Sequence, residues 1–438
     1  MAARLLRAGR LQSVARHSSG SVAPAGSRWP SQEPSAASLL YGINRTDPQV
    51  DARARRRGHA SSDTRLGSAQ QGDLEAAPRS RDLSLPADIP SICAAALPGW
   101  RHLAGEGIHV EPLPGTSNRN FKVHLASPAA QGAGALDTVL FRVYGAGLEL
   151  LYDHELQVQI ARMLSSRGVA AQIHAQGPGW RIEQWWHNAA PLPNARMKEP
   201  AIMAQVAAHI ARFHQISSSR SDFPARITAL PPASISRLET WGRACQQAAL
   251  EAPQLQASIA LREILAERAW VADFVREGDD RIAGVGLDVV FSHWDIQENN
   301  ILLVPDGLQL IDFEYSGMDY QSIDLATYFI ECAIDLDVQD PPYYKVNLAD
   351  MPTEDEMRFF CAAYLSEYLA APIQPSDPRA VVLARRAERF TLALHLLWAM
   401  WSVVRACRAS SESFDYLNYG RARWSLYKRA KRALLDKL

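Results

Sequence analysis

The sequence predicts an α+β protein with two lobes, a small β-rich lobe over residues 86–186 and a large helical lobe over residues 187–438. In the first range, short runs of alternating apolar and polar residues lie between turn-forming residues, as in strands. In the second range, apolar residues recur at helical spacing over long segments. A compact β segment at 289–315 interrupts this helical pattern once.

The composition is that of an ordinary folded chain. Of 438 residues, 47% are hydrophobic and 21% are charged, which suits one large domain or two lobes. The 46 Lys and Arg residues balance 47 Asp and Glu residues, so the charge gives no reason to expect nucleic-acid binding. Five scattered cysteines without a C-x-x-C pair indicate reduced thiols. The sequence contains no run of about 18 apolar residues, so it predicts no membrane-spanning helix.

Residues 1–85 differ from the rest, and we expect them to form a disordered tail outside the fold. Residues 1–32 contain no Asp or Glu and are rich in Arg, Ala and Ser, which is typical of a mitochondrial or plastid transit peptide. A basic disordered tail, or a start codon placed too far upstream, explains the same composition. We therefore expect a cytoplasmic protein, with a mitochondrion or plastid as the alternative.

The elements of each lobe are predicted in chain order. The first lobe begins with a short helix over 91–105 and has an amphipathic helix near 150–166. Its strands are expected at 108–113, 121–125, 138–144 and 180–186. The long helices of the second lobe are expected at about 197–217, 235–278, 353–371 and 378–408.

A hairpin within the segment 289–315 brings polar residues together. Two apolar runs flank Asp306-Gly307, which is a strong hairpin signal. If these two residues form the tip, Asn300 faces Phe313; if Pro305 joins the loop, Asn300 faces Asp312. Either register places the Asn300 amide near the Asp312 carboxylate at the open end of the hairpin.

These residues have the chemistry that phosphoryl transfer requires. Mg²⁺ prefers oxygen ligands, which Asn300 and Asp312 supply, and the upstream Asp295 is placed to accept a hydroxyl proton. The chain carries the pattern H-x-D-x(4)-N, followed by a hairpin and then D-F-x. This pattern resembles the catalytic and metal loops of kinases, with Glu314 where protein kinases carry Gly. The alternative is an unrelated loop with acidic residues.

The nucleotide side is predicted from weaker signals. The turn-rich segment 114–118 could cover phosphates with backbone N–H groups, or be only a turn. Arg142 on a strand and Glu155 on the next helix have the spacing of a cation–carboxylate pair that holds ATP phosphates, or of an exposed salt bridge. Gln184 lies where the two lobes would join.

An aromatic cluster marks the C-terminal part of the chain. Trp398 and Trp401 share one face of a helix, and Phe414 and Tyr419 follow after a polar break. Such a pair is more often core, although aromatic faces also bind quaternary ammonium groups by cation–π attraction of about 2 kcal/mol or more. Two residues could complete such a pocket, Tyr315 with a ring and Glu331 with a counter-charge.

The chain resembles the choline/ethanolamine kinase family over about residues 88–431. The resemblance lies in the catalytic segment Asp295 to Asn300 and in the motif I-D-F-E-Y-S at 311–316. It continues at 329–331 and resumes at 395–402 and 414–419. Upstream, the segments 115–118, 140–145 and 181–184 also match.

The resemblance implies a two-lobed protein-kinase-like fold, also found in aminoglycoside phosphotransferases, and a role for each motif. Asp295 would be the catalytic base, Gln297 would lie near the γ-phosphate, and Asn300 and Asp312 would hold Mg²⁺. Residues expected to bind ATP are Gly115, Ser117, Asn118, Arg142, Glu155 and Gln184. Residues expected to form the amino-alcohol pocket are Tyr315, Glu331, Trp398, Trp401, Phe414 and Tyr419.

The sequence also departs from the family pattern. Trp294 replaces the usual Asn after the His, Asn299 replaces the usual Gly, and neither position bears a role. Pro114 stands where the family has the first Gly of its loop. After Glu331 the chain carries fewer aromatic residues than choline kinases do, so we expect one wall of the pocket to differ.

The resemblance favours choline as the acceptor, with some ethanolamine activity. The activity implied is conversion of choline to phosphocholine with ATP and Mg²⁺, the first step of phosphatidylcholine synthesis by the CDP-choline route. An ethanolamine or dual-specificity kinase is the alternative; another small-molecule kinase of the same fold or a binding-only pseudokinase is a weaker one. The family also implies a possible homodimer, and no nucleic-acid partner is expected.

Overall fold

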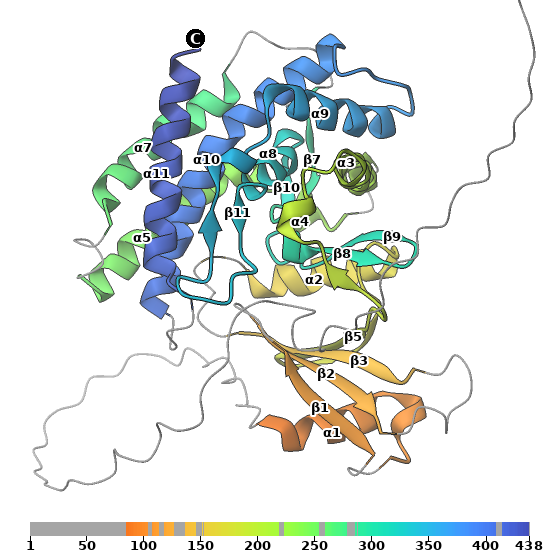
Figure 1. Ribbon diagram of the computed structural model, residues 1–438. Coiled ribbons are helices and arrows are strands. Elements are labelled where there is room, and N and C mark those ends of the chain that lie inside the picture. Colours follow the sequence, from red (N-terminus) through yellow and green to blue (C-terminus); the bar gives the residue numbers. More distant parts are fainter. Residues whose placement is uncertain are drawn as a thin grey trace, which may run out of the picture. The chain divides into compact units, whose positions relative to one another are not determined.

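The structure, a computed structural model, places a β-rich part before a mainly helical part, which confirms the predicted two-lobed α+β fold (Figure 1). It describes residues 85–103, 107–113, 118–126, 136–145, 151, 153–218, 223–253, 259–277, 285–286, 288–408 and 414–437. All of these belong to one compact unit, Ala36–Leu438. The tail predicted for residues 1–85 therefore lies almost entirely outside the described residues, and the lobe boundary near residue 186 stays a prediction.

The first lobe is a five-stranded antiparallel sheet in the order β1-β2-β3-β5-β4. Its strands are β1 (Ile108–Leu113), β2 (Arg119–Leu125), β3 (Thr138–Val143), β4 (Ile173–Gly177) and β5 (Trp180–Gln184). Alternate residues such as Phe121 and Val139 pack with α1 (Leu85–Ala96) into one apolar cluster. The sequence predicted four strands and missed β4, whose residues are all half-buried and give no clear alternation.

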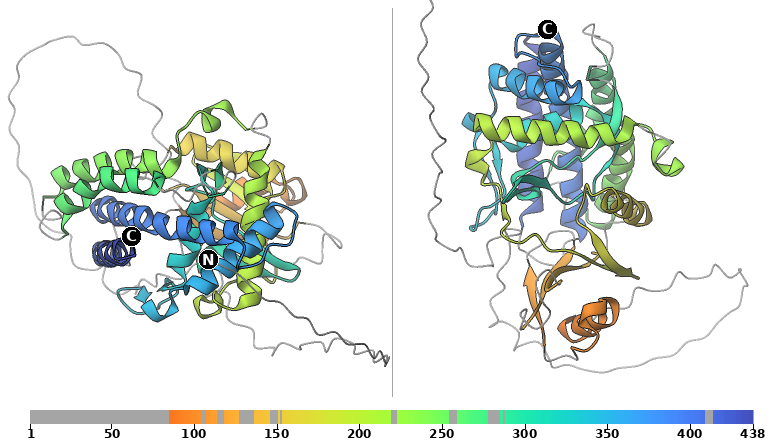
Figure 2. Two further views of the ribbon diagram at one scale, coloured as in Figure 1. Left: turned by 90° about the horizontal axis from the view of Figure 1, so that it is seen from above. Right: turned by 90° about the vertical axis from the view of Figure 1, so that its right-hand side faces the viewer.

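The second lobe surrounds one long helix, α10 (Pro378–Arg408), which packs against α5, α7, α8, α9 and α11. Figures 1 and 2 show α10 and α11 side by side. Further helices in the described part of the chain are α2 (His154–Ser166), α3 (Pro200–Gln215), α4 (Ala225–Thr228), α5 (Ala233–Glu251), α7 (Leu261–Arg276), α8 (Ser322–Glu331), α9 (Glu354–Tyr368) and α11 (Tyr416–Leu435). Short 3₁₀ turns are η2 (Pro98–Trp100), η4 (Asn194–Arg196), η5 (Ile216–Ser218), η7 (Glu298–Asn300) and η8 (Leu348–Asp350).

Several helix boundaries differ from those predicted. The single helix expected over 235–278 is two helices, because α5 ends at Glu251 just before Pro253, which cannot continue a helix. The helix expected over 91–105 begins earlier and ends at Ala96. The sequence analysis did not predict α8 or α11, although both contribute to the candidate site described below.

The helix α10 is long and apolar enough to cross a bilayer by length and composition, which the sequence analysis did not expect. However, 83% of its most apolar window is buried inside the protein, and its neighbours cover it on several sides. A buried core helix has the same composition as a membrane-spanning one. The packing therefore accounts for its apolar character.

The described residues of the second lobe form three small sheets. One contains β6 (Ala190–Pro191), β8 (Ile301–Val304) and β9 (Gly307–Leu310), a second pairs β7 (Val289–Ser292) with β10 (Gly317–Tyr320), and a third pairs β11 (Ile334–Asp335) with β12 (Lys345–Val346).

The hairpin β8–β9 has a different register from both of those predicted. Val304 pairs with Gly307, so the two-residue turn consists of Pro305 and Asp306. Proline fixes φ at the first turn position, and Gly307 adopts a φ of +136° that side-chain-bearing residues avoid. Asn300 therefore lies opposite Ile311, one residue before Asp312, with an N–H···O bond of 3.0 Å between their backbones.

The packing around α10 generates a stability prediction. Leu394 is completely buried on α10, so Leu394→Ala should lower the free energy of unfolding by about 2–5 kcal/mol. Leu250 on α5 is 79% exposed, and Leu250→Ala should change that free energy by less than about 0.5 kcal/mol. Urea unfolding followed by tryptophan fluorescence measures both. Equal effects would contradict a core centred on α10.

Candidate active site

A buried carboxylate fixes the loop that carries the predicted catalytic residues. Asp324, in the first turn of α8, accepts hydrogen bonds from the backbone N–H groups of His293 and Trp294, each at 2.7 Å. A third bond of 3.0 Å joins it to Nε2 of His214. Burial opposes ionisation of Asp324, but the hydrogen bond to His214 helps to lower its pKa. An ionised acceptor for two backbone donors holds the loop in one position.

The replacement Trp294 supports the same loop. It is buried in the left-handed region at φ +79°, which is unusual for a large side chain. Its indole N–H donates to Asp319 at 2.9 Å, and the Arg237 guanidinium lies 4.1 Å from its ring. The sequence analysis assigned this position no role, whereas the structure shows that it packs and anchors the catalytic loop.

The structure joins Asp295 to Asn300. The Asn300 amide nitrogen donates to the Asp295 carboxylate at 2.7 Å and to its backbone carbonyl at 3.0 Å. Burial raises the pKa of Asp295 well above its usual range, and the charges of Glu331, Asp312 and Glu314 raise it further. A group of carboxylates that oppose each other's ionisation is a favourable place for a cation.

Asn300 and Asp312 present the oxygen ligands expected for Mg²⁺. The amide oxygen of Asn300 takes part in neither bond to Asp295, and Asp312 follows the residue that pairs with Asn300. No cluster of three or more His, Cys, Asp or Glu residues suited to a metal occurs within the described ranges. Since Mg²⁺ in kinases takes one or two protein ligands and completes its shell with phosphate and water, these two residues have the ligand types that such a site requires.

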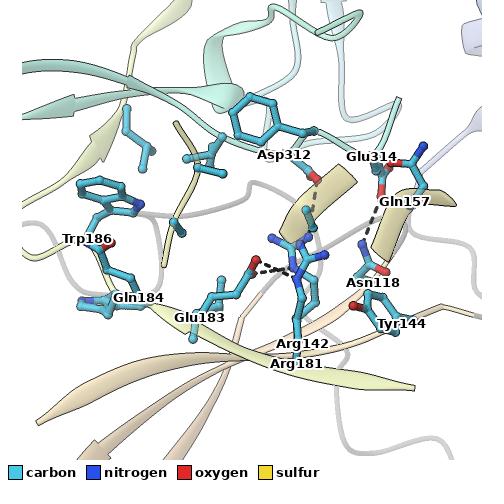
Figure 3. A pocket seen from close by; sticks show the side chains of 18 of the residues that line it. Asn118, Arg142, Tyr144, Gln157, Arg181, Glu183, Gln184, Trp186, Asp312 and Glu314 are labelled. Carbon is cyan, nitrogen blue, oxygen red and sulfur yellow. Dashed lines mark hydrogen bonds and ion pairs between the residues drawn. The ribbon is translucent and has the colours of Figure 1, made fainter. Parts of the chain in front are cut away.

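A cleft of about 950 Å³, counting its open mouth, separates this hairpin from the sheet of the first lobe. Figure 3 shows Arg142 and Glu183 at its centre, Asp312 above them, and Glu314 near Asn118. Gln184 and Trp186 lie at the opposite end. Basic and aromatic side chains at one cleft are suited to a nucleotide, with its phosphates nearer Arg142 and its base nearer Trp186.

Arg142 pairs with a different carboxylate from the one predicted. Its Nε lies 3.1 Å from Glu183, and its Nη1 lies 3.5 Å from Asp312. The side chain of Glu155 is 76% exposed and lies 3.5 Å from Arg226, so the expected pair of Arg142 with Glu155 is wrong. The reason is topological, because β3 pairs with β5 and brings Arg142 beside Glu183, whereas Glu155 lies in the exposed first turn of α2.

The Arg142 partner Glu183 is itself held in place. Arg181 lies 2.7 Å from its other oxygen. Burial works against ionisation of Glu183, but the two arginines lower its pKa. Glu183 therefore stays charged and fixes the Arg142 guanidinium toward the cleft.

The other predicted nucleotide residues have mixed outcomes. The Asn118 amide donates to Glu314 at 3.1 Å and accepts from the backbone of Gly145 at 3.2 Å, so it links the two walls of the cleft. Gln184 lines the cleft as expected. Gln297 caps η7 by accepting the Asn299 N–H at 2.9 Å. Gly115 and Ser117 lie outside the described residues.

The predicted aromatic residues come together in what we call the aromatic box. Its members are Tyr315, Trp398, Trp401, Phe414 and Tyr419. Trp401 donates its indole N–H to the Tyr315 hydroxyl at 2.8 Å, and the Tyr315 ring lies 5.4 Å from that of Trp398. Rings of Phe414 and Tyr419 are 5.3 Å apart, and Tyr419 lies 6.5 Å from Trp401. Most contacts are edge-to-face, which leaves ring faces in several directions.

Sequence analysis missed a further aromatic wall. Tyr344, just before β12, lies 5.2 Å from Tyr419 and 5.9 Å from Phe414. It adds a ring beside two members of the aromatic box. No local pattern marks Tyr344, because only the pairing of β11 with β12 brings it to this place.

The predicted counter-charge Glu331 is paired, which the sequence did not indicate. Arg423 of α11 lies 2.6 Å from Oε1 of Glu331. The Arg423 side chain is 2% exposed and the Glu331 side chain is 3% exposed. Arg423 also donates to the Tyr419 hydroxyl. Tyr419 and Arg423 lie one helical turn apart, so they share one face of α11. A prediction of this helix from the sequence would therefore have placed Arg423 beside Tyr419.

Known proteins match this sequence and this fold. The family model described as choline/ethanolamine kinase matches residues 111–428. A choline/ethanolamine kinase from Rattus norvegicus is 29% identical over 338 residues, which cover 75% of this chain and 82% of the rat protein. An Arabidopsis thaliana protein described as a probable ethanolamine kinase is 28% identical over 364 residues, covering 80% of this chain and 87% of that protein.

A solved structure agrees. The crystal structure of a choline kinase from Cryptosporidium parvum Iowa II has a TM-score of 0.69 and 28% identity, covering 80% of this chain and 96% of that one. The family match spans well over half of the sequence and includes the catalytic loop, the cleft and the aromatic box. This chain belongs to the choline/ethanolamine kinase family.

Proposed function

We propose that this protein transfers the γ-phosphate of ATP to the hydroxyl of choline, giving phosphocholine and ADP. The observation that carries the proposal is the short segment from Asp312 to Tyr315, which joins two sites. Asp312 and Glu314 line the nucleotide cleft, whereas Tyr315 enters the aromatic box through its bond to Trp401. An acceptor held in the box therefore has its hydroxyl near the phosphates.

Asp295 is suited to the proton-transfer role. The acceptor hydroxyl oxygen attacks the γ-phosphorus, the bond from phosphorus to the bridging oxygen of ADP breaks, and the hydroxyl proton passes to the Asp295 carboxylate. Asn300 keeps that carboxylate oriented through its 2.7 Å bond. Arg142, fixed by Glu183, offsets phosphate charge from the opposite wall. Mg²⁺ held by Asn300 and Asp312 would neutralise charge on the phosphates when bound.

The aromatic box favours choline over ethanolamine. Choline presents three methyl groups and no N–H donor, so ring faces can stabilise its charge without hydrogen bonds. Arg423 already offsets the charge of Glu331, so ring faces supply more of the attraction. Ethanolamine needs acceptors for its N–H groups, and Oε2 of Glu331 is buried without a partner among the described residues. That oxygen supports a secondary ethanolamine activity.

The acceptor preference can be measured directly. With Mg²⁺-ATP and both amino alcohols in competition, kcat/KM for choline should be at least about tenfold higher, which is about 1.4 kcal/mol of discrimination. Preference for ethanolamine would contradict the choline assignment and keep the kinase assignment. Absence of turnover with either acceptor would contradict both.

Loss of the proposed base should abolish turnover. Asp295→Asn keeps the size and hydrogen-bonding shape of the side chain but cannot accept the proton, so kcat should fall about 10²–10⁴-fold while ATP still binds. The control is Asp306→Asn, an exposed residue in the turn of the adjoining hairpin, which should leave kcat unchanged. A variant Asp295→Asn that keeps more than about a tenth of kcat would falsify the base assignment.

The aromatic box should affect the acceptor and not the nucleotide. Trp401→Ala removes a ring face and the donor to Tyr315, so the choline KM should rise about 30-fold with little change in the ATP KM. Trp270→Ala on α7, where the ring packs on Phe274, serves as the control and should change neither constant. Equal increases in both constants for Trp401→Ala would mean that this residue is only part of the core.

We also propose a cytoplasmic location and, as the resemblance implies, a homodimer. Five free cysteines, of which all but Cys407 are buried, suit a reducing compartment. Cell fractionation and light scattering of the purified protein test the two proposals separately. Recovery of the chain in mitochondria or plastids would favour the transit-peptide interpretation of residues 1–32.

A further inference from the structure

The ion pair between Glu331 and Arg423 is an unusual feature of the pocket. The carboxylate ends α8 and the guanidinium comes from α11, and both side chains are almost fully buried. Only one oxygen and one nitrogen of the pair meet, at 2.6 Å. Within the described part of the chain, Oε2 of Glu331 and both Nε and Nη1 of Arg423 are buried and make no hydrogen bond.

An ion pair that served only to join two helices would not have this geometry. A buried pair contributes little net stability unless hydrogen bonds satisfy its remaining donors and lone pairs. Here Arg423 could bind both oxygens side by side, but it binds Oε1 and turns to the Tyr419 hydroxyl. Oε2 is left as a buried acceptor without a partner among the described residues, on a carboxylate that Arg423 links to Tyr419 of the aromatic box.

We propose that Arg423 is a positioning residue that keeps Glu331 ionised and leaves its Oε2 available to the cationic group of the amino alcohol. This inference deepens the proposed function and rests on it. Arg423 itself touches no reacting atom. It acts through Glu331 and through Tyr419, whose ring lies 4.8 Å from the guanidinium carbon.

Charged and titratable groups near Glu331 come from several neighbouring elements. The catalytic loop contributes Asp295 and Glu298, both of which are affected by the negative charge of Glu331. From α11 come Arg423 and Tyr419. The helix α10 contributes His395, whose pKa is well below its usual range because of burial and the charge of Arg423. Of these groups, only Arg423 is a cation that favours the ionised carboxylate.

The protonation of Glu331 therefore depends on Arg423. Burial raises the pKa of Glu331, and the charge and hydrogen bond of Arg423 limit that rise. Without Arg423, the desolvation and the neighbouring carboxylates act unopposed, so the pKa of Glu331 rises further. The carboxylate then becomes protonated as the pH falls through this higher pKa, so the pocket keeps its anion at higher pH and loses it at lower pH.

The test measures the choline KM of Arg423→Met between pH 6.5 and 8.5. Choline carries a permanent charge, so pH changes report on the protein and not on the acceptor. At pH 6.5 the choline KM should be about tenfold above that of the unmodified protein, and by pH 8.5 the ratio should fall below about threefold. The ATP KM should stay the same throughout. Arg423→Lys, which keeps the charge, should restore most of the affinity.

Two controls separate this role from a structural one. Lys431→Met removes another cation of α11, which pairs with Glu267 at 2.5 Å, and should not change the pH profile. In a Glu331→Gln background, Arg423→Met should have no pH-dependent effect, because no titrating group remains to be controlled. This double variant buries no unpaired charge and so tests the idea even if Arg423→Met alone fails to fold.

The outcomes distinguish the inference from the proposed function. A choline KM raised equally at all pH values, or raised together with the ATP KM, would show that Arg423 only joins α8 to α11. The same conclusion follows if Arg423→Met has its full effect in the Glu331→Gln background. If the unmodified protein phosphorylates neither amino alcohol, the proposed function fails and the inference fails with it.

Discussion

The organisation of the site depends on the hydrogen bonds that Asp324 accepts from the backbone of His293 and Trp294. Asp324 belongs to the first turn of α8, and Glu331 is the last residue of the same helix. One helix therefore fixes the loop that begins at His293 at one end and the Glu331 carboxylate, which pairs with Arg423, at the other. Helices transmit position well because their backbone bonds are satisfied internally. Movement of α8 would displace both parts of the site together.

Charge is distributed unevenly across this site. Glu183 lies between two arginines and stays ionised, so that wall of the nucleotide cleft carries net positive charge from Arg142 and Arg181. On the hairpin side, burial and mutual repulsion raise the pKa of Asp295, with contributions from Asp312, Glu314 and Glu331. An anionic phosphate chain suits the first wall, and cations suit the second. Electrostatic preorganisation of this kind is a large part of how phosphoryl transfer is catalysed.

Most of the elements could be predicted from local patterns, whereas the roles expected of the motif residues came from the family resemblance. The strands of the first lobe follow from alternation, and the Asp-Gly turn signalled the hairpin even though its register was wrong. The aromatic residues of α10 were recognised from their helical spacing. Interactions between distant segments were harder to predict. Arg142 was paired with Glu155 because a cation on a strand and a carboxylate on the next helix have the spacing of a pair that holds ATP phosphates. The order of strands in the sheet instead brings Arg142 beside Glu183.

The sequence by itself determined the α+β class, the kinase-like motif and the family, because these depend on residue types at short, fixed spacings. Only the tertiary structure decided which distant side chains form ion pairs and ring contacts. It paired Glu331 with Arg423 and brought Tyr344 to the aromatic wall. Such contacts join residues far apart in the chain, and their energy depends on burial. Neither separation nor burial of a single side chain follows from local spacing, so only the packed fold could specify them.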